Sequence, residues 1–378
     1  MDHVNVVVKV TNACNLRCAY CYNKETDYAS DLLPLERFTK FLRILSERYK
    51  SIEVIWHGGE PMLAGIDYMT KAVAAEEEIS LHTGVKIANK IQTNGTLIDK
   101  KWATFFKKHD FKPGISFDGL QNEKHRQGTK KVLDAFNILR KHDVRFGTLA
   151  VVADSEYDLL ENYKYFASLK LATDFSPVFQ EGGAKNLTAL SAEKFAADMI
   201  KLFDYWLYDK TGVNVRLFST YISMILGKSC RVCTNSSCIG SFFSIYPNGD
   251  VFNCGRASMA AYPFGNVDDI NSVDDLLNSN GFRNLLIGAI ARREKCKASC
   301  DLFPYCCGGC SDQAILEGAL DSAPAFSCYC FKTIFTHVRE AVNEIIANKT
   351  PLTELNPAVK RVWIDCFSLE NDREEDKK

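Results

Sequence analysis

The sequence predicts an α/β fold, a partial (β/α)6 barrel followed by a small cysteine-rich unit. Strand-like and helix-like segments alternate through the first half of the chain, polar and glycine-rich motifs follow the strand-like segments, and the cysteines gather in two separate regions. Alternating strands and helices form parallel sheets with right-handed crossovers. In barrels of this kind the chemistry lies at the carboxyl ends of the strands.

Six strands, each followed by a helix, are expected in a TIM-type arrangement within residues 1–210. The first strand, 4–10, is a valine-rich run that ends at a cysteine loop. The other strands are predicted at 52–57, 86–93, 112–117, 145–152 and 173–179. Helices between them are predicted, for example, at 35–48, 99–108, 130–141 and 156–169. A helical linker at 211–229 should then lead into the cysteine-rich unit.

Composition and charge narrow the class of protein. The chain has 378 residues, of which 46% are hydrophobic and 25% charged, so it should form globular domains. A net charge of −1 gives no reason to expect nucleic acid or an anionic membrane as a partner, and no segment is apolar enough to span a membrane. The polar N-terminus is unlike a secretory signal, which predicts a cytoplasmic protein with reduced thiols. In such a reducing compartment, the fifteen cysteines of the chain indicate metal binding and not disulfides.

The loop after the first strand carries Cys14, Cys18 and Cys21 with the spacing C-x3-C-x2-C. Three thiolates on one short loop suit a cubane iron–sulfur cluster whose fourth iron stays open. A structural zinc site would require four protein ligands instead. The loop therefore predicts a reactive centre.

Polar motifs follow the next three predicted strands. They are His57-Gly-Gly-Glu-Pro61, Gln92-Thr-Asn-Gly95, and Ser116-Phe-Asp-Gly119 with His125-Arg126 shortly after it. Each motif alone is more often an ordinary turn or loop. Because all of them follow successive strands of the same sheet, one ligand could contact all of them together with the cysteine loop.

The C-x3-C-x2-C motif with Tyr20 before its last cysteine resembles the radical S-adenosylmethionine (SAM) superfamily. The resemblance implies that Cys14, Cys18 and Cys21 hold a [4Fe–4S] cluster whose open iron chelates SAM. An electron from the cluster would cleave the sulfonium bond, and the resulting 5′-deoxyadenosyl radical would abstract hydrogen from a substrate. The positions that match SAM-binding residues of the family are Tyr20, Gly58, Gly59, Glu60, Thr93, Asn94, Ser116 and Arg126.

The second cysteine region, 230–336, resembles the SPASM extension of peptide- and protein-modifying radical SAM enzymes. Pro247-Asn-Gly249 between two short strand-like runs predicts a β-hairpin, and Gly249 and Cys254 match the Gly-x4-Cys signature. A C-terminal helix and a charged tail are expected at 337–378.

The SPASM resemblance implies two auxiliary [4Fe–4S] clusters, and so three clusters in all. The ligands of the first would be Cys233, Cys238, Cys254 and Cys310, and those of the second Cys296, Cys300, Cys306 and Cys330. Cys230 competes with Cys233, and Cys328 with Cys330, while Cys307 and Cys366 have no assigned role. The C-x3-C spacing of Cys296 and Cys300 departs from the family's C-x2-C. A zinc-ribbon structure without redox chemistry is the alternative for this region considered by itself.

Two enzymatic functions fit this family, and both act on a peptide or protein. The preferred one is maturation of a ribosomally synthesised peptide by a thioether or carbon–carbon crosslink or a related modification. The alternative is an anaerobic sulfatase-maturing enzyme, which makes formylglycine from Cys or Ser. Its proton acceptor is expected directly after the cysteine of Gly-x4-Cys, where this chain has Gly255. Glycine cannot accept a proton, so that function would need Asp250 or another acid, and the catalytic acid or base stays unidentified.

The expected partners are a precursor peptide and a low-potential electron donor such as flavodoxin or ferredoxin. The chain starts at the first strand, without the leader-binding domain of many peptide-maturing enzymes. A separate leader-binding protein, or direct binding of the leader in the barrel, would then be required. A non-catalytic metal-binding scaffold is a third, disfavoured hypothesis, because a scaffold has no need of an open iron facing glycine motifs.

Overall fold

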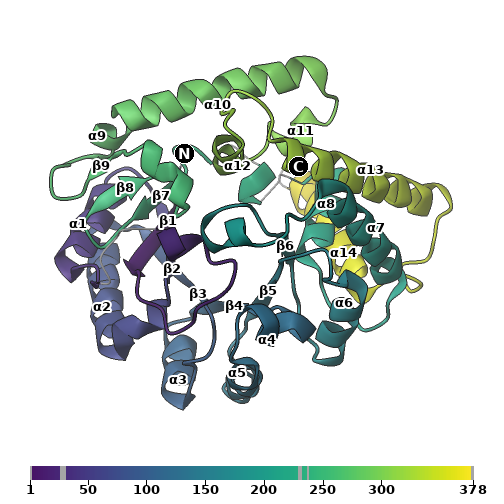
Figure 1. Ribbon diagram of the computed structural model, residues 1–378, viewed down its shortest axis with the longest axis horizontal. Helices are drawn as coiled ribbons and strands as arrows, with labels where there is room; N and C mark the ends of the chain where they lie inside the picture. The colour runs from purple at the N-terminus through teal and green to yellow at the C-terminus, as the bar shows by residue number, and fades with distance from the viewer. Residues whose placement is uncertain (1, 26–30, 229–231, 236–237, 376–378) are drawn as a thin grey trace.

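A single sheet of nine strands organises the computed structural model, which describes residues 2–25, 31–228, 232–235 and 238–375 (Figure 1). Six neighbouring strands, β6-β5-β4-β3-β2-β1, are parallel, as the sequence predicts for a partial barrel. They span His3–Thr11 (β1), Ser51–Gly58 (β2), Lys86–Thr93 (β3), Lys112–Ser116 (β4), Gly147–Val152 (β5) and Phe175–Pro177 (β6).

Helices cover the outer face of this parallel sheet (Figure 1). They span Leu35–Ser46 (α1), Gly65–Thr83 (α2), Lys100–Lys108 (α3), Asn122–His125 (α4), Thr129–Lys141 (α5) and Leu159–Ser168 (α6). In α1, Phe38, Phe41, Leu42 and Leu45 are buried at helical spacing. In β1 the even-numbered valines are fully buried, and the opposite, odd-numbered face carries Val7 and Lys9. The odd-numbered face of β1 is the one that meets the functional site.

The predicted last strand is shorter than expected. It was expected at 173–179, but β6 covers only Phe175–Pro177, and Thr173 forms an isolated bridge with Val215. Its partner strand β5 ends at Val152, the residue paired with Pro177, so the paired part of β6 ends there.

The second cysteine region continues the barrel sheet. Strand β7 (Phe242–Ile245) pairs in parallel with β1, and β8 (Asp250–Phe252) forms the predicted hairpin with β7. Gly249 closes the turn at φ +92°, a conformation that favours glycine. The short strand β9 (Gly265–Asn266) completes the sheet. The parallel pairing of β7 with β1 was not foreseen from the sequence.

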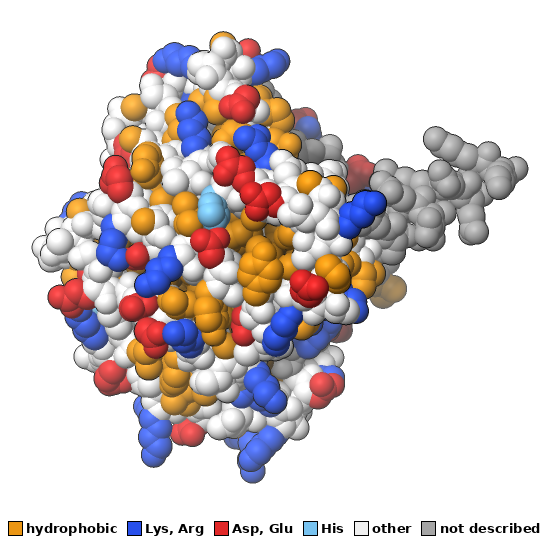
Figure 2. Space-filling view, turned by 90° about the vertical axis from the view of Figure 1, so that its right-hand side faces the viewer, with side chains coloured by type: hydrophobic (Ala, Val, Ile, Leu, Met, Phe, Trp, Pro, Cys, Tyr) orange, Lys and Arg blue, Asp and Glu red, His pale blue; other side chains and the backbone are white. Residues whose placement is uncertain are grey.

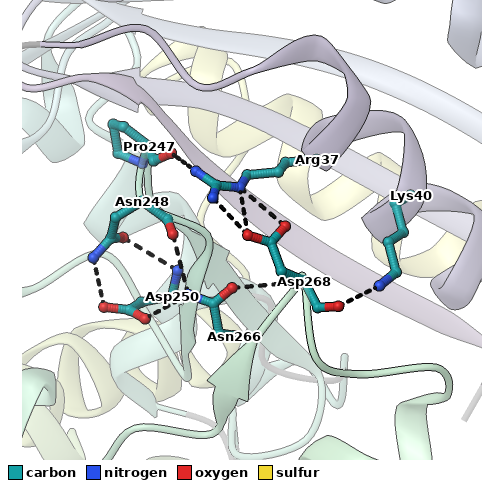
Figure 3. Close-up of polar contacts among 7 residues, drawn as sticks. All are labelled: Arg37, Lys40, Pro247, Asn248, Asp250, Asn266 and Asp268. Carbon is teal, nitrogen blue, oxygen red and sulfur yellow. Dashed lines mark hydrogen bonds and ion pairs between the residues drawn. The ribbon is translucent and has the colours of Figure 1, made fainter.

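Arg37 of α1 fastens this hairpin region to the barrel (Figure 3). Its Nε lies 3.0 Å from both carboxylate oxygens of Asp268, its Nη2 lies 2.5 Å from Oδ2, and its Nη1 donates to the carbonyl of Pro247 at 2.9 Å. Inside the hairpin, Asn248 and Asn266 donate to the carboxylate of Asp250 at 2.7 and 2.9 Å. The carboxylate of Asp250 thus serves the hairpin.

The remaining helices surround the cysteine region and close one side of the barrel (Figure 1). They span Ala192–Tyr208 (α7), Arg216–Ile225 (α8), Val273–Leu277 (α9), Asn280–Ser299 (α10), Phe303–Cys306 (α11), Ser311–Leu316 (α12), Ala325–Ala347 (α13) and Pro357–Glu375 (α14). Helix α8 lies within the predicted linker, and α13 runs through the boundary expected at residue 336. The proposed division into domains stays a prediction.

The face around α6, α7 and α13 carries charges of both signs between apolar side chains (Figure 2). Tyr208 of α7 and Ile346 of α13 are exposed apolar side chains. Among the described residues, no helix has the length and apolar character required to cross a membrane.

Candidate active site at the carboxyl ends of the strands

Backbone hydrogen bonds hold the cysteine loop after β1 on two sides. The amides of Gly59 and Glu60 donate to the carbonyls of Thr11 and Ala13, both at 2.8 Å. A Cβ atom on Gly59 would lie 2.2 Å from the carbonyl oxygen of Ala13, so only glycine fits there. On the other side, the amide of Gly183 donates to the carbonyl of Cys21 at 2.9 Å. The loop therefore lies between the end of β2 and the loop that follows β6.

The three cysteines of this loop fit an iron–sulfur cluster. The Sγ atom of Cys14 accepts a hydrogen bond from the amide of Leu16 at 3.4 Å. Burial raises the pKa of the Cys14 and Cys18 thiols, and the nearby Arg126 charge opposes that shift. The two polar side-chain atoms of Asn12 are buried without a hydrogen-bond partner among the described residues. The loop thus offers three sulfurs, a nearby cation and unused polar atoms.

Glu60 joins the motifs that follow β2 and β3. Its Oε1 accepts from the Thr93 hydroxyl at 2.7 Å and from the Met62 amide at 3.1 Å, and its Oε2 accepts from the Asn94 amide at 2.8 Å. Burial raises the pKa of Glu60, while these hydrogen bonds lower it. The Nδ2 atom of Asn94 lies 4.0 Å from Cys14 Sγ. Three of the residues expected to contact SAM are therefore together, with the Glu60 side chain bracing the two strand ends.

Tyr20 and Arg126 are also brought together, through an aspartate that sequence reasoning gave no weight. The Tyr20 hydroxyl donates to Asp118 Oδ2 at 2.5 Å, and Arg126 Nη1 donates to the Tyr20 oxygen at 2.9 Å. Asp118 is fully buried and also accepts from the amide of Val151 at 2.9 Å. Ser116, the last residue of β4, accepts a hydrogen bond from Gln92 Nε2 at 2.9 Å. Contacts of all these residues with SAM stay a prediction.

A second group of polar residues lies beside the cysteine loop and was missed from the sequence. We call it the inner polar cluster, and it consists of Lys9, Tyr22, Glu181, Arg256 and Asp312. Lys9 is fully buried, and its Nζ donates to the Tyr22 hydroxyl at 2.9 Å. The Arg256 guanidinium lies over the Tyr22 ring, 4.8 Å from its centroid. The charged Lys9 within the valine-rich run of β1 was the feature of the sequence that could have indicated this cluster.

Electrostatics within this cluster follow from burial. Burial and the adjacent Arg256 charge lower the pKa of Lys9 to about 7. The neighbouring His57 has a pKa lowered to about 3 by burial and by the Lys9 charge, so its imidazole is neutral. Its Nδ1 accepts from the amide of Gly58 at 2.8 Å.

Lys9 explains why residue 255 is glycine. A Cβ atom on Gly255 would lie 2.8 Å from Lys9 Cε and 3.0 Å from Val7 Cγ1. The volume expected for an aspartate side chain is therefore filled by the lysine.

The ligands expected for the first auxiliary cluster lie close enough to influence one another's titration. Burial raises the pKa of the Cys310 thiol to about 12, with smaller contributions from Asp312, Cys238 and Cys233. Burial likewise raises the pKa of Cys254, which Cys310 and Cys238 raise further. Asn253 Nδ2 lies 3.5 Å from Cys238 Sγ. The competing Cys230 lies outside the described residues.

The second set of cysteines favours Cys328 over Cys330. Cys296 is in the last turn of α10 and Cys300 caps that helix, so the unusual spacing places both on one helix face. Cys328 influences the titration of Cys306, and Cys296 and Cys300 influence that of Cys328. The Sγ atom of Cys330 instead points to the carbonyl of Ala192 in α7, at 3.6 Å.

These thiols line a cavity of about 440 Å³, bounded by α8, α10 and α13. In the described part of the chain, no three His, Cys, Asp or Glu side chains are grouped to hold one metal ion. A single zinc ion would bring its sulfurs to about 2.3 Å from one point, whereas a cubane cluster binds each thiolate to a different iron.

Comparisons of sequence place the chain among known proteins. The family model of the radical SAM superfamily matches residues 8–160. The cysteine-type anaerobic sulfatase-maturating enzyme of Clostridium perfringens is 28% identical, over 89% of this chain and 96% of that protein. The serine-type anaerobic sulfatase-maturating enzyme of Bacteroides thetaiotaomicron is also 28% identical, over 88% of this chain and 89% of that protein.

Solved structures agree with these matches. Native anSMEcpe with bound AdoMet and the Kp18Cys peptide has a TM-score of 0.78 and 25% identity, covering 91% of this chain and 99% of that chain. Streptococcus suis SuiB bound to its precursor peptide SuiA has a TM-score of 0.60 at 18% identity, covering 85% and 74%, and shares the fold. With its cysteine loop, its partial barrel and these matches, the chain belongs to the radical SAM superfamily of enzymes.

Proposed function

We propose that this enzyme oxidises a Cys or Ser side chain of a peptide or protein to formylglycine. The observation that carries the proposal is the match, over nearly nine-tenths of the chain, with cysteine-type and serine-type sulfatase-maturating enzymes. The related structure with a bound Cys peptide supports a peptide substrate. The comparisons thus favour the function that the sequence placed second.

Membership in the superfamily implies a [4Fe–4S] cluster and SAM, which together supply a radical that removes hydrogen from the substrate. The residues of this chain hold and orient the reactants. Cys14, Cys18 and Cys21 would hold the cluster, and Gly58 and Gly59 would let SAM approach the backbone closely. The other predicted SAM contacts are Tyr20, Glu60, Thr93, Asn94, Ser116 and Arg126. Arg126 is held in place by the Tyr20 hydroxyl, so it meets SAM as an oriented cation.

We further propose two auxiliary [4Fe–4S] clusters. The first would be held by Cys233, Cys238, Cys254 and Cys310, as expected from the sequence. The second would be held by Cys296, Cys300, Cys306 and Cys328, a choice supported by the mutual electrostatic influence of Cys328 and these three thiols. A cytoplasmic flavodoxin or ferredoxin is the proposed electron donor.

The test uses protein reconstituted with iron and sulfide under anaerobic conditions, with SAM, a reductant and the Kp18Cys peptide or its Ser counterpart. We expect 5′-deoxyadenosine together with a peptide aldehyde that reacts with a hydrazide reagent. Replacing Cys14, Cys18 and Cys21 by Ala should abolish SAM cleavage and leave the auxiliary iron bound. Cleavage that survives in this variant would contradict the assignment of the loop.

Gly255 keeps peptide crosslinking as a second candidate, since the expected proton acceptor is missing there. A separate leader-binding protein is a proposed partner for this candidate alone. Peptide crosslinking would give a product that does not react with hydrazide, so the same assay separates crosslinking from formylglycine formation.

A further inference from the structure

Formylglycine formation, on which this inference rests, requires a proton acceptor that the sequence motif does not supply. The S–H or O–H proton of the substrate must leave, and Gly255 has no side chain to receive it. Asp250 is not available, because its carboxylate accepts from Asn248 and Asn266 within the hairpin (Figure 3). The inner polar cluster contains two other carboxylates, Glu181 and Asp312.

Glu181 lies next to the cysteine loop. It follows β6 and directly precedes the short helical segment Gly182–Asn186. A Cβ atom on Gly182 would be 2.6 Å from the carbonyl oxygen of Cys21, and the Gly183 amide donates to that same oxygen at 2.9 Å. The position of Glu181 is therefore fixed relative to the loop that would hold the radical-generating cluster.

The Glu181 side chain contacts Arg256 and Ser258, which follow Gly255 closely in the sequence. Its Oε1 accepts from the amide of Ser258 at 3.2 Å, and Arg256 Nη1 lies 3.5 Å from its Oε2. A carboxylate from the loop after β6 thus reaches the segment where the acceptor was expected.

One oxygen of Glu181 makes no hydrogen bond. The residue is 5% exposed, and Oε2 is buried with the Arg256 charge nearby but without a hydrogen-bond partner among the described residues. A buried carboxylate oxygen without a hydrogen-bond partner is unfavourable unless a ligand satisfies it. Asp312 differs, because its Oδ1 accepts from the hydroxyl of Ser258 and its Oδ2 lies 3.8 Å from Arg256 Nε.

We propose that Glu181 is the proton acceptor of the reaction, replacing the aspartate that is absent at position 255. After a hydrogen atom has left Cβ of the substrate, the S–H or O–H bond breaks and the proton moves to Glu181 Oε2. A C=S or C=O bond forms, and an oxidised iron–sulfur cluster held by the cysteines would accept the remaining electron. The Ser product is then the aldehyde, and the Cys product becomes the same aldehyde when water replaces sulfur as hydrogen sulfide.

The surroundings of Glu181 suit this role. Burial and the Asp312 charge raise the pKa of Glu181, while Arg256, the Ser258 amide and Lys9 lower it. Tyr22 faces the same space with a neutral hydroxyl, because burial raises its pKa. A carboxylate with a raised pKa is a stronger base near neutral pH.

The test replaces Glu181 by Gln, which keeps the shape and an acceptor for Ser258 but cannot take up a proton. We expect aldehyde formation from the Kp18Cys peptide to fall on the order of 100-fold or more, and Glu181→Asp to recover part of it. In the wild-type enzyme the rate should fall as pH is lowered through the raised pKa of Glu181, and this inflection should be absent from the Gln variant. Glu161→Gln, which changes an exposed glutamate paired with Lys164 on α6, is the matched control and should match the wild type.

Aldehyde formation by Glu181→Gln at the wild-type rate, or with an unchanged pH inflection, overturns the proposal. A second measurement, thermal stability without substrate, tests the proposal even if the variant assembles its clusters poorly. Because the folded-state pKa of Glu181 is raised, the wild type should lose stability relative to the Glu181→Gln variant as pH rises above the ordinary glutamate pKa. If the melting temperatures of the wild type and of Glu181→Gln change equally as pH rises above the ordinary glutamate pKa, the proposal is overturned as well. A wild-type enzyme that makes no aldehyde contradicts the proposed function itself, whatever the melting curves show.

Discussion

Glu76 shows at the residue scale how one buried carboxyl group is accommodated away from the site. It lies on α2 with 3% of its surface exposed, and Asn89 Nδ2 donates to its Oε2 at 2.5 Å. Asn89 in turn accepts from Trp56 Nε1 at 2.7 Å. Burial raises the pKa of Glu76 to about 8, so the group is protonated in the folded protein at neutral pH.

Stability should therefore depend on pH through Glu76. The folded form keeps its proton up to about pH 8, whereas the unfolded form loses it near 4.5. The contribution to stability is complete below pH 4.5 and is lost as pH rises to about 8. Glu76→Gln should remove this loss and raise the melting temperature at about pH 8.5 relative to the wild type. Circular dichroism melting at about pH 5 and about pH 8.5 tests this, and equal pH dependence of both proteins would contradict it.

Gly255 and Lys9 should show coupled effects on stability. A methyl group at 255 must displace the lysine side chain, so Gly255→Ala should destabilise the protein by about 1–3 kcal/mol. Lys9→Ala frees that volume, so the double variant should be more stable than the two single changes predict by addition. Urea denaturation of the four proteins measures the coupling energy, and strict additivity would show that the two residues do not compete for space.

At the scale of elements, Arg37 joins helix α1 to the hairpin region. It forms a two-pronged contact with Asp268 and also binds the Pro247 carbonyl, although both charged side chains are partly exposed. Exposed pairs contribute little, up to about 1 kcal/mol. The chief consequence of this contact is to fix where the hairpin lies.

Arg37→Ala should loosen the hairpin without unfolding the barrel. We expect faster amide hydrogen exchange in residues 244–252, with exchange in β2 and β3 unchanged. Arg43→Ala is the matched control, because Arg43 lies on the same helix and makes a single exposed contact with Glu78 at 3.2 Å. Equal exchange in the two variants would show that Arg37 does not hold the hairpin.

Elements with strong local patterns were predicted well from the sequence. β3 lies at the residues expected, and the hairpin follows from Pro247-Asn-Gly249, because turn chemistry acts locally. The shortened β6 was missed, since the length of this edge strand depends on where its partner β5 ends, at Val152. The pairing of β7 with β1 was missed for another reason: it joins residues more than 200 positions apart, and no local pattern records it.

At the scale of the whole molecule, the proposed second auxiliary cluster draws ligands from three helical elements. Cys296 and Cys300 come from the end of α10, Cys306 from α11 and Cys328 from the first turn of α13. These segments meet only in the folded chain. The choice between Cys328 and Cys330 therefore depends on how α13 faces its neighbours.

Iron analysis should distinguish these two cysteines. The reconstituted wild type should hold about twelve iron atoms per chain if three [4Fe–4S] clusters are present. Cys328→Ser should lower the iron content or weaken one cluster signal, whereas Cys330→Ser should keep the wild-type content, because Cys330 points at α7. The reverse result would restore Cys330 as the ligand, and iron content near four would contradict both auxiliary clusters.

Periodicity and ligand spacing were enough to predict the parallel barrel and the reactive cysteine loop, because both are local properties of the amino-acid sequence. They also located the motifs of the site, since parallel strands place their carboxyl ends at one edge. The superfamily was predicted from the resemblance of the C-x3-C-x2-C motif to a known family. Folding adds three features: Lys9 fills the space beside Gly255, Glu181 reaches the segment after Gly255 from the loop after β6, and the thiol of Cys328 comes under the electrostatic influence of Cys296 and Cys300. These contacts join residues far apart in the chain, and only the order of strands and the packing of helices bring them together.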